Sequence, residues 1–122
     1  MLRIDALQEE EKHPQAPQTQ GVAVQWLLDE QRGSPHFGLQ RFVVEVGGQT
    51  VLHRHEWEHA IYVLSGEGEL IGEDVTFPLQ RDTAVLVAPG EKHQFRNTGD
   101  KPLKYLVVVP SGPATIHQPP AK

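Results

Sequence analysis

The residues of this sequence best suited to chemistry are histidines that gather around one short segment. His53, His55 and His59 lie close together, and His93 follows a Pro89-Gly90 turn much later in the chain. Residues two apart on a strand point to the same face, so His53 and His55 are expected to project together, and a tight turn can return His59 to that face. Neutral imidazoles that converge from a rigid scaffold bind divalent transition metals. The spacing favours a metal site over the alternative, a group of surface or hydrogen-bonded histidines.

The rest of the chain offers little competing chemistry. The sequence has no cysteine, which excludes disulfides, thiolate ligands and cysteine nucleophiles. His13, His36 and His117 stand in contexts that do not predict a ligand. Glu58 is a weak candidate for a general base, and a solvated loop carboxylate is the more ordinary interpretation. No acid-base pair stands out, so the sequence identifies no catalytic residue.

Short strands separated by turn residues must position these histidines. Gly, Pro and Asp punctuate the chain in the manner of an all-β sandwich or barrel, and no stretch has a sustained helical period. The strands are expected over residues 22–28, 37–46, 51–55, 59–65, 69–72, 75–79, 83–87, 94–97 and 103–109. The second of these is expected to end at Gly47-Gly48.

The 122 residues are enough for one domain with one core. Residues 1–20 lack a packing period and are expected to be a mobile arm or an edge segment. Residues 21–110 form the predicted barrel, and residues 111–122 are an expected C-terminal tail. The formal charge of -5, with scattered basic residues, argues against a nucleic-acid surface. No apolar run is long enough for a membrane span or a signal peptide, so a cytoplasmic protein is expected.

Two motifs in this frame resemble those of the cupin superfamily. The first contains Gly47, His53, His55 and Gly66, with His59 where the family usually has a glutamate. The second contains Pro89-Gly90, His93 and Asn97, although Ala88 and Asp82 depart from it. The resemblance implies an all-β jelly-roll barrel, or double-stranded β-helix, of two facing antiparallel sheets.

The histidine at position 59 makes the chain similar to small single-domain cupins with four histidine ligands. That resemblance implies one divalent metal per chain, bound by His53, His55, His59 and His93. It also favours manganese, while imidazole ligands suit iron, nickel, zinc, cobalt and copper as well. Four neutral ligands would leave the charge of the ion uncompensated, so a small anionic or enolate-like ligand is expected. Trp57, between two of these histidines, is expected to be a packing or rim residue.

Strand alternation predicts which other side chains face the metal. Apolar residues dominate that face, with the Gln40 amide and the Tyr105 hydroxyl as its few polar groups. The expected pocket residues are Gln40, Phe42, Phe95, Tyr105 and Val107.

Two classes of function fit these features. The first is a metal-dependent oxidoreductase of the dioxygenase type acting on a small organic substrate, with a metal-dependent isomerase as a variant. The second is a non-catalytic module that binds or senses a metal or a small ligand. A homodimer is also expected, because the strand over 22–28 would lie at an edge of the barrel, and edges are usually paired or covered.

Overall fold

The computed structural model describes residues 1–112 and confirms the all-β fold. Its strands are β1 (Gln20–Leu28), β2 (Phe37–Gln49), β3 (His59–Ser65), β4 (Gly68–Ile71), β5 (Thr76–Leu79), β6 (Ala84–Val87), β7 (Gln94–Asn97) and β8 (Leu103–Pro110). The helical elements of the described residues are two single 3₁₀ turns, Ala6–Gln8 and Glu30–Arg32. None of the helices found in the described residues has the length and apolarity that crossing a membrane requires.

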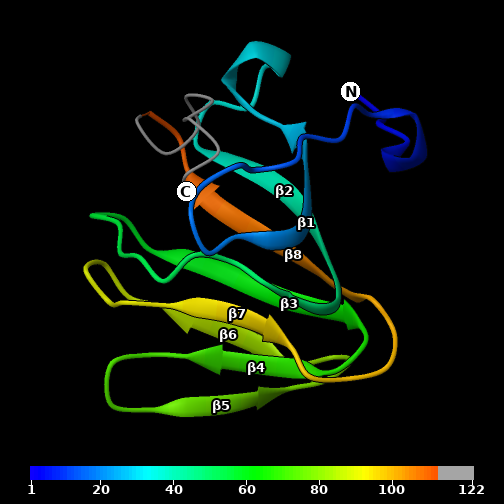
Figure 1. Ribbon diagram of the computed structural model, residues 1–122. Coiled ribbons are helices and arrows are strands. Elements are labelled where there is room, and N and C mark those ends of the chain that lie inside the picture. Colours follow the sequence, from blue (N-terminus) through cyan, green and yellow to red (C-terminus); the bar gives the residue numbers. More distant parts are fainter. Residues whose placement is uncertain (113–122) are drawn as a thin grey trace.

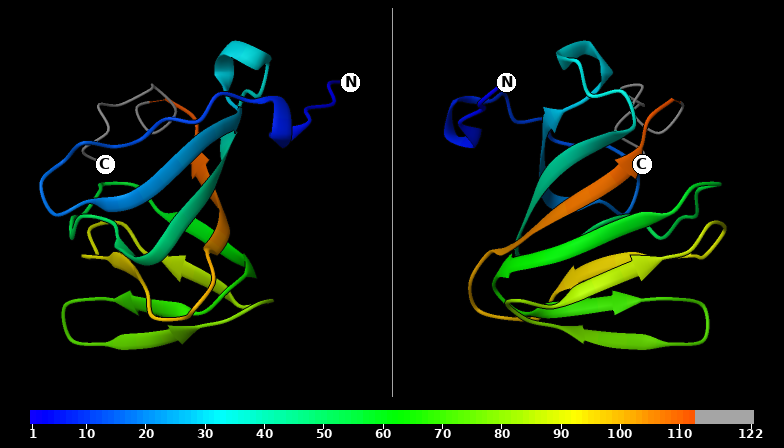
Figure 2. Two further views of the ribbon diagram at one scale, coloured as in Figure 1. Left: turned by 45° about the vertical axis from the view of Figure 1, so that its right-hand side comes forward. Right: turned by 180° about the vertical axis from the view of Figure 1, so that it is seen from behind.

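The strands form one antiparallel ladder in the order β5-β4-β7-β2-β8-β3-β6, with β1 paired to β2. Strand β2 lies in the middle of this order and joins its two halves, because it pairs with β8 along much of its length and with β7 at Gln49. The sheet curls on itself (Figures 1 and 2), so strands from its two halves enclose a common interior. This is the barrel that the sequence predicted.

The alternation of side chains shows which face of the curled sheet lies inside. In β8, Leu103, Tyr105, Val107 and Val109 are buried, while the residues between them are more exposed. Strand β3 alternates in the same way from His59 onward. Side chains from both halves meet in one apolar core that contains Val44, Val63, Leu70, Leu79, Val87 and Phe95 among others. Burial of these side chains, each worth roughly 1.5–3 kcal/mol, is the main stabilising contribution.

Most expected bounds are within two residues of the observed ones, and two expectations differ by more. Residues 51–55 do not form a strand, and only a single bridge between His53 and His93 occurs there. The second strand does not end at Gly47-Gly48, because β2 continues to Gln49. Gly47 has a φ of 78°, and the pairing of β1 with β2 shifts register between Gln20 and Val22. Glycine therefore bends this strand where a simple reading predicts a stop.

The N-terminal segment lies against β1. Lys12 forms backbone hydrogen bonds in both directions with Val24, at 2.8 Å each. The buried amide of Gln25 donates to the carbonyl oxygens of Ala6 and Glu9, at 2.6 and 3.1 Å. These contacts hold the segment along the edge of the barrel. Most of the expected C-terminal tail, including His117, lies outside the described residues.

Candidate functional site

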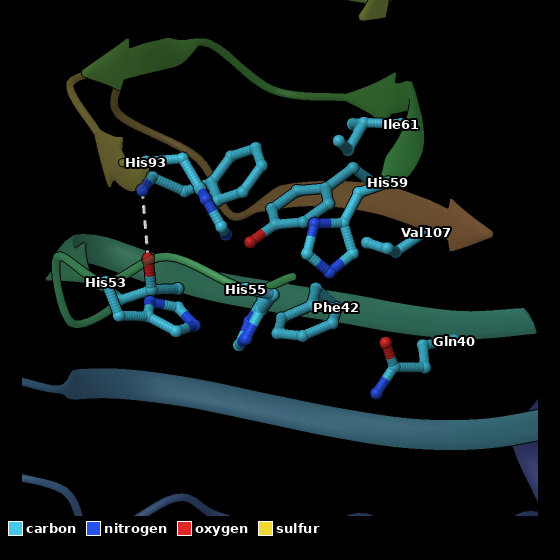
Figure 3. Close-up of a pocket in the computed structure, with 11 residues that line it drawn as sticks. Gln40, Phe42, His53, His55, His59, Ile61, His93 and Val107 are labelled. Carbon is cyan, nitrogen blue, oxygen red and sulfur yellow. Dashed lines mark hydrogen bonds between the residues drawn. The ribbon is translucent and has the colours of Figure 1, made fainter. Parts of the chain in front are cut away.

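Backbone hydrogen bonds join the two segments that carry the histidines. His53 and His93 each donate a backbone N–H to the carbonyl of the other, over 3.2 and 2.9 Å. Figure 3 shows the second of these bonds. The Gly90 N–H donates to the His55 carbonyl over 2.7 Å, and Gly90 has a φ of 82°, which favours glycine. The Pro89-Gly90 turn and the loop at 53–55 are therefore held together through their main chains.

The four predicted histidines surround one space (Figure 3). One ring nitrogen from each of His53, His55 and His93 lies within 4.8 Å of the others, close enough to share one metal ion. His59 is not part of this tight group, but its ring centroid lies 4.9 Å from that of His55 and 5.1 Å from that of His93. The structure thus brings all four rings together and places three of them closest.

Two of these rings have a defined tautomer. Nδ1 of His53 lies 2.8 Å from the Val51 carbonyl oxygen, and Nδ1 of His93 lies 3.1 Å from that of Glu91. A carbonyl oxygen can only accept, so each Nδ1 carries the proton and each Nε2 keeps its lone pair. In metal sites, a histidine ligand is commonly oriented by a hydrogen bond from the ring nitrogen that does not bind the metal, and Nδ1 of each of these two rings makes such a bond. Both rings therefore fit a divalent ion bound through Nε2.

His59 and His55 are oriented by Trp57. The indole N–H donates to Nε2 of His59 over 3.2 Å. The same indole stacks on His55, with ring centroids 4.8 Å apart and an angle of 3° between the planes. Trp57 also packs on the hydrophobic core. The expectation of a packing residue was incomplete, because the indole also occupies a nitrogen of a predicted ligand.

A cavity extends from the histidines into the barrel. The space among its lining side chains, counted out into the open solvent at its mouth, is about 410 Å³. Its lining contains all five expected pocket residues together with the four histidines, Thr50 and Ile61. Phe42, Tyr105 and Phe95 form an aromatic wall, in which Tyr105 stacks on Phe42 at 5.1 Å and on Phe95 at 4.4 Å. No carboxylate, lysine or arginine is among the described lining residues.

Tyr105 brings a hydroxyl to this apolar wall. The side chain is fully buried, and no group of residues 1–112 forms a hydrogen bond with its oxygen. Burial raises the pKa of Tyr105 well above its ordinary value. The hydroxyl is therefore a neutral donor at physiological pH, in a position to meet a ligand in the cavity.

The other side chains singled out in the sequence lie away from the cavity. Glu58 is exposed and does not line the cavity, so its position does not favour a role as a general base. Arg54, which stands between His53 and His55 in the sequence, is also exposed, and its guanidinium lies 3.8 Å from the Glu73 carboxylate. The buried amide of Asn97 donates to the Val44 and Lys101 carbonyls and accepts from the Gly99 N–H, which fixes the turn after β7. His13 and His36 are also absent from the lining.

Thr50 and Ile61 are lining residues that the sequence analysis missed. Ile61 follows His59 by two positions on the same strand, so strand alternation was a sufficient signal for it. Thr50 had no such signal. Its hydroxyl accepts the Phe95 N–H and its carbonyl accepts the Gln94 side chain, both over 2.9 Å, contacts between residues far apart in the sequence.

Comparisons with known proteins agree with this geometry. A protein-family model described as "Cupin domain" matches residues 40–109. Among solved structures, the polyketide cyclase RemF from Streptomyces resistomycificus superimposes with a TM-score of 0.85 at 31% identity. The match covers 92% of this chain and 80% of that one. Both findings include the histidine segments and the strands that surround the cavity.

Curated relatives are matched over shorter stretches. The oxalate-binding protein of Thermotoga maritima is 33% identical over 70 residues, which are 57% of this chain and 58% of that protein. Auxin-binding protein 1 of Arabidopsis thaliana is 30% identical over 79 residues, or 57% of this chain and 40% of that protein. The chain thus spans about half the length of the curated relatives that it matches. Another curated relative is an enzyme, the 1-methylthio-D-xylulose 5-phosphate methylsulfurylase of Rhodospirillum rubrum, which is 34% identical over 73 residues, or 58% of this chain and 46% of that protein.

Proposed function

The chain belongs to the cupin family, and from that premise we propose that it is a metal-dependent enzyme acting on a small, enolisable organic anion. His53, His55 and His93 would hold the divalent ion, with His59 available as a fourth ligand. The observation that carries the proposal is the chemical asymmetry of the cavity. Imidazole nitrogens meet at one point, and the described lining offers no carboxylate to balance the charge of an ion.

The absence of a carboxylate among the described residues beside the imidazoles favours an anionic ligand. A metal ion bound there supplies a Lewis acid that polarises carbonyl oxygens and stabilises an enolate. Because the protein contributes only neutral groups, an anionic ligand restores the charge balance that a glutamate would otherwise provide. Manganese is the proposed ion, with iron, nickel, zinc, cobalt and copper as alternatives that imidazole ligands also suit.

The side chains of the cavity orient the substrate and exclude water. The stacked rings of Phe42, Tyr105 and Phe95 form a flat apolar surface that suits an unsaturated or planar carbon chain. The Tyr105 hydroxyl would donate a hydrogen bond to a carbonyl or enol oxygen, and the buried Gln40 amide offers a second polar contact. A substrate whose carbon chain is longer than the cavity would extend through the mouth of the cavity.

Ring closure of a polycarbonyl compound is the reaction we favour. The likeness to the polyketide cyclase, over most of both chains, supports it. In such a step a proton leaves the enolisable carbon, that carbon bonds to a carbonyl carbon, and the carbonyl oxygen takes up a proton. Protons come from and return to water, and no oxidant is needed. The neutral Tyr105 hydroxyl is suited to stabilise the developing charge on the carbonyl oxygen.

Oxygen-dependent oxidation, the reaction favoured by the sequence analysis, is the second candidate. The nitrogen-only donor set supports it, because such sites hold redox-active metals. Protein loaded with manganese or iron should be incubated with 1,3-diketones and linear triketones in an oxygen electrode, followed by mass analysis. Ring closure predicts a product that keeps its mass or loses water without oxygen consumption, while oxidation predicts uptake. Binding of these compounds without turnover would indicate a non-catalytic binding module and would contradict the proposal of an enzyme.

A further inference from the structure

Trp57 contacts two of the four histidines in different ways. Its ring is stacked in parallel on His55, and its N–H donates to Nε2 of His59. The indole is anchored against the hydrophobic core, so its position is fixed by packing. A single side chain therefore controls the orientation of both rings.

The hydrogen bond to His59 bears on metal binding. A histidine can bind a metal only through a nitrogen lone pair, and the indole N–H already occupies the lone pair of Nε2. His59 is also the one ring of the four that stays outside the tight group, although its centroid lies about as far from His93 as that of His55 does, at 5.1 and 5.4 Å. The ring of His59 therefore lies beside the group, with its Nε2 held by the indole N–H.

We propose that Trp57 is a positioning residue that competes with the metal for Nε2 of His59. The inference rests on the proposed function in one respect, namely that a divalent metal binds at the cluster. With the indole bond in place, the site presents three imidazoles and leaves an additional position on the ion for a substrate. Exchange of that bond for a bond to the metal would add a fourth imidazole. Because this exchange breaks the indole bond, Trp57 makes metal binding weaker.

The test uses Trp57→Phe, which retains a ring to stack on His55 and removes the N–H donor. Zinc affinity would be measured by competition with a chelating dye for the native protein, Trp57→Phe, His59→Ala and the double variant. A neutral hydrogen bond contributes about 0.5–1.5 kcal/mol, so Trp57→Phe should bind zinc about 2- to 10-fold more tightly. In the His59→Ala background the same change should have no effect, because the competition has no target.

A second readout is measured on the native protein, and a variant serves only to assign its resonances. The chain has two tryptophans, so its indole N–H groups give two resonances, and Trp57→Phe assigns them. Zinc added to the native protein should accelerate the hydrogen exchange of the Trp57 indole, because its acceptor is withdrawn. An exchange rate unchanged by saturating zinc would overturn the proposal.

The affinities separate this inference from the proposed function. Unchanged or weaker zinc binding in Trp57→Phe would overturn it, as would an equal gain in both backgrounds. If His53→Ala and His93→Ala lose zinc while Trp57→Phe behaves as the native protein, only the role of Trp57 is wrong. If those two variants keep zinc, the metal site itself is wrong, and this inference falls with it.

Discussion

Tyr105 places a buried hydroxyl in the cavity wall without a hydrogen-bond partner among the described residues. An unsatisfied buried polar group costs about 1–3 kcal/mol. Tyr105→Phe should therefore leave the free energy of unfolding of the metal-free protein at pH 8 unchanged, or raise it within that range. The same change should weaken binding of a 1,3-diketone to the loaded protein about 3- to 10-fold. Urea unfolding and titration calorimetry measure the two effects, and a destabilised variant with native diketone affinity would contradict this role.

The raised pKa of Tyr105 also predicts a dependence of stability on alkaline pH. Its cause is burial, which disfavours the tyrosinate in the folded state, whereas the unfolded chain ionises near pH 10. The folded protein therefore keeps its full stability below about pH 10 and loses stability as the pH rises toward the folded pKa, because Tyr105 then ionises only in the unfolded chain. Unfolding measured from pH 8 to 11.5 should show a steeper loss for the native protein than for Tyr105→Phe.

Tyr62→Phe is the matched control for this titration. The pKa of Tyr62 is also raised, first because its hydroxyl donates to Asp82 over 2.8 Å, but this side chain is exposed. Its replacement should leave the alkaline slope close to that of the native protein. Equal slopes for all three proteins would contradict the burial of a neutral Tyr105.

The identities of most cavity-lining residues were predictable, whereas their hydrogen bonds were not. Strand parity and motif spacing selected the four histidines and five of the lining residues from the sequence. The bond from Trp57 to His59 depends on the orientation of two rings within one loop, for which no periodic signal exists. The contacts of Thr50 depend on a partner segment more than 40 residues away.

At the level of elements, the turn at Gly90 should affect metal binding as well as stability, although Gly90 does not line the cavity. Gly90 and Gly33 both have positive φ, at 82° and 90°, and both have open space where a Cβ would lie. Alanine at either position should cost about 1–2 kcal/mol of stability. Only Gly90→Ala should also weaken zinc binding, by about 10-fold, because its N–H holds the His55 carbonyl. Equal zinc affinities in the two variants would contradict this coupling.

The segment over 51–55 shows where the prediction of elements failed. His53 and His55 converge with His93, as expected, but not because they share a strand. A single bridge at His53 and the bond from Gly90 to His55 produce the convergence. Alternation of residue types cannot distinguish a strand from an extended loop held by one bridge, since both have similar backbone angles.

At the scale of the whole molecule, the homodimer stays a prediction. Strand β1 pairs with β2 on one side, and on the other side its described backbone partner is Lys12. The N-terminal segment covers part of this edge, so the prediction concerns a strand from a second copy on the remaining part, because unpaired edges favour such pairing. Light scattering at micromolar concentration should give the mass of a dimer, and a monomer there would contradict the expectation.

The central claim is a single metal site formed by the histidines of two segments that are distant in sequence. Metal analysis after loading and gel filtration tests it on the native protein, His53→Ala, His93→Ala and the control His13→Ala. The native protein and the control should carry close to one divalent ion per chain. The two site variants should lose most of it while keeping a native far-ultraviolet spectrum, because the barrel core is apolar and does not depend on the ion. Full occupancy in His93→Ala would contradict the site.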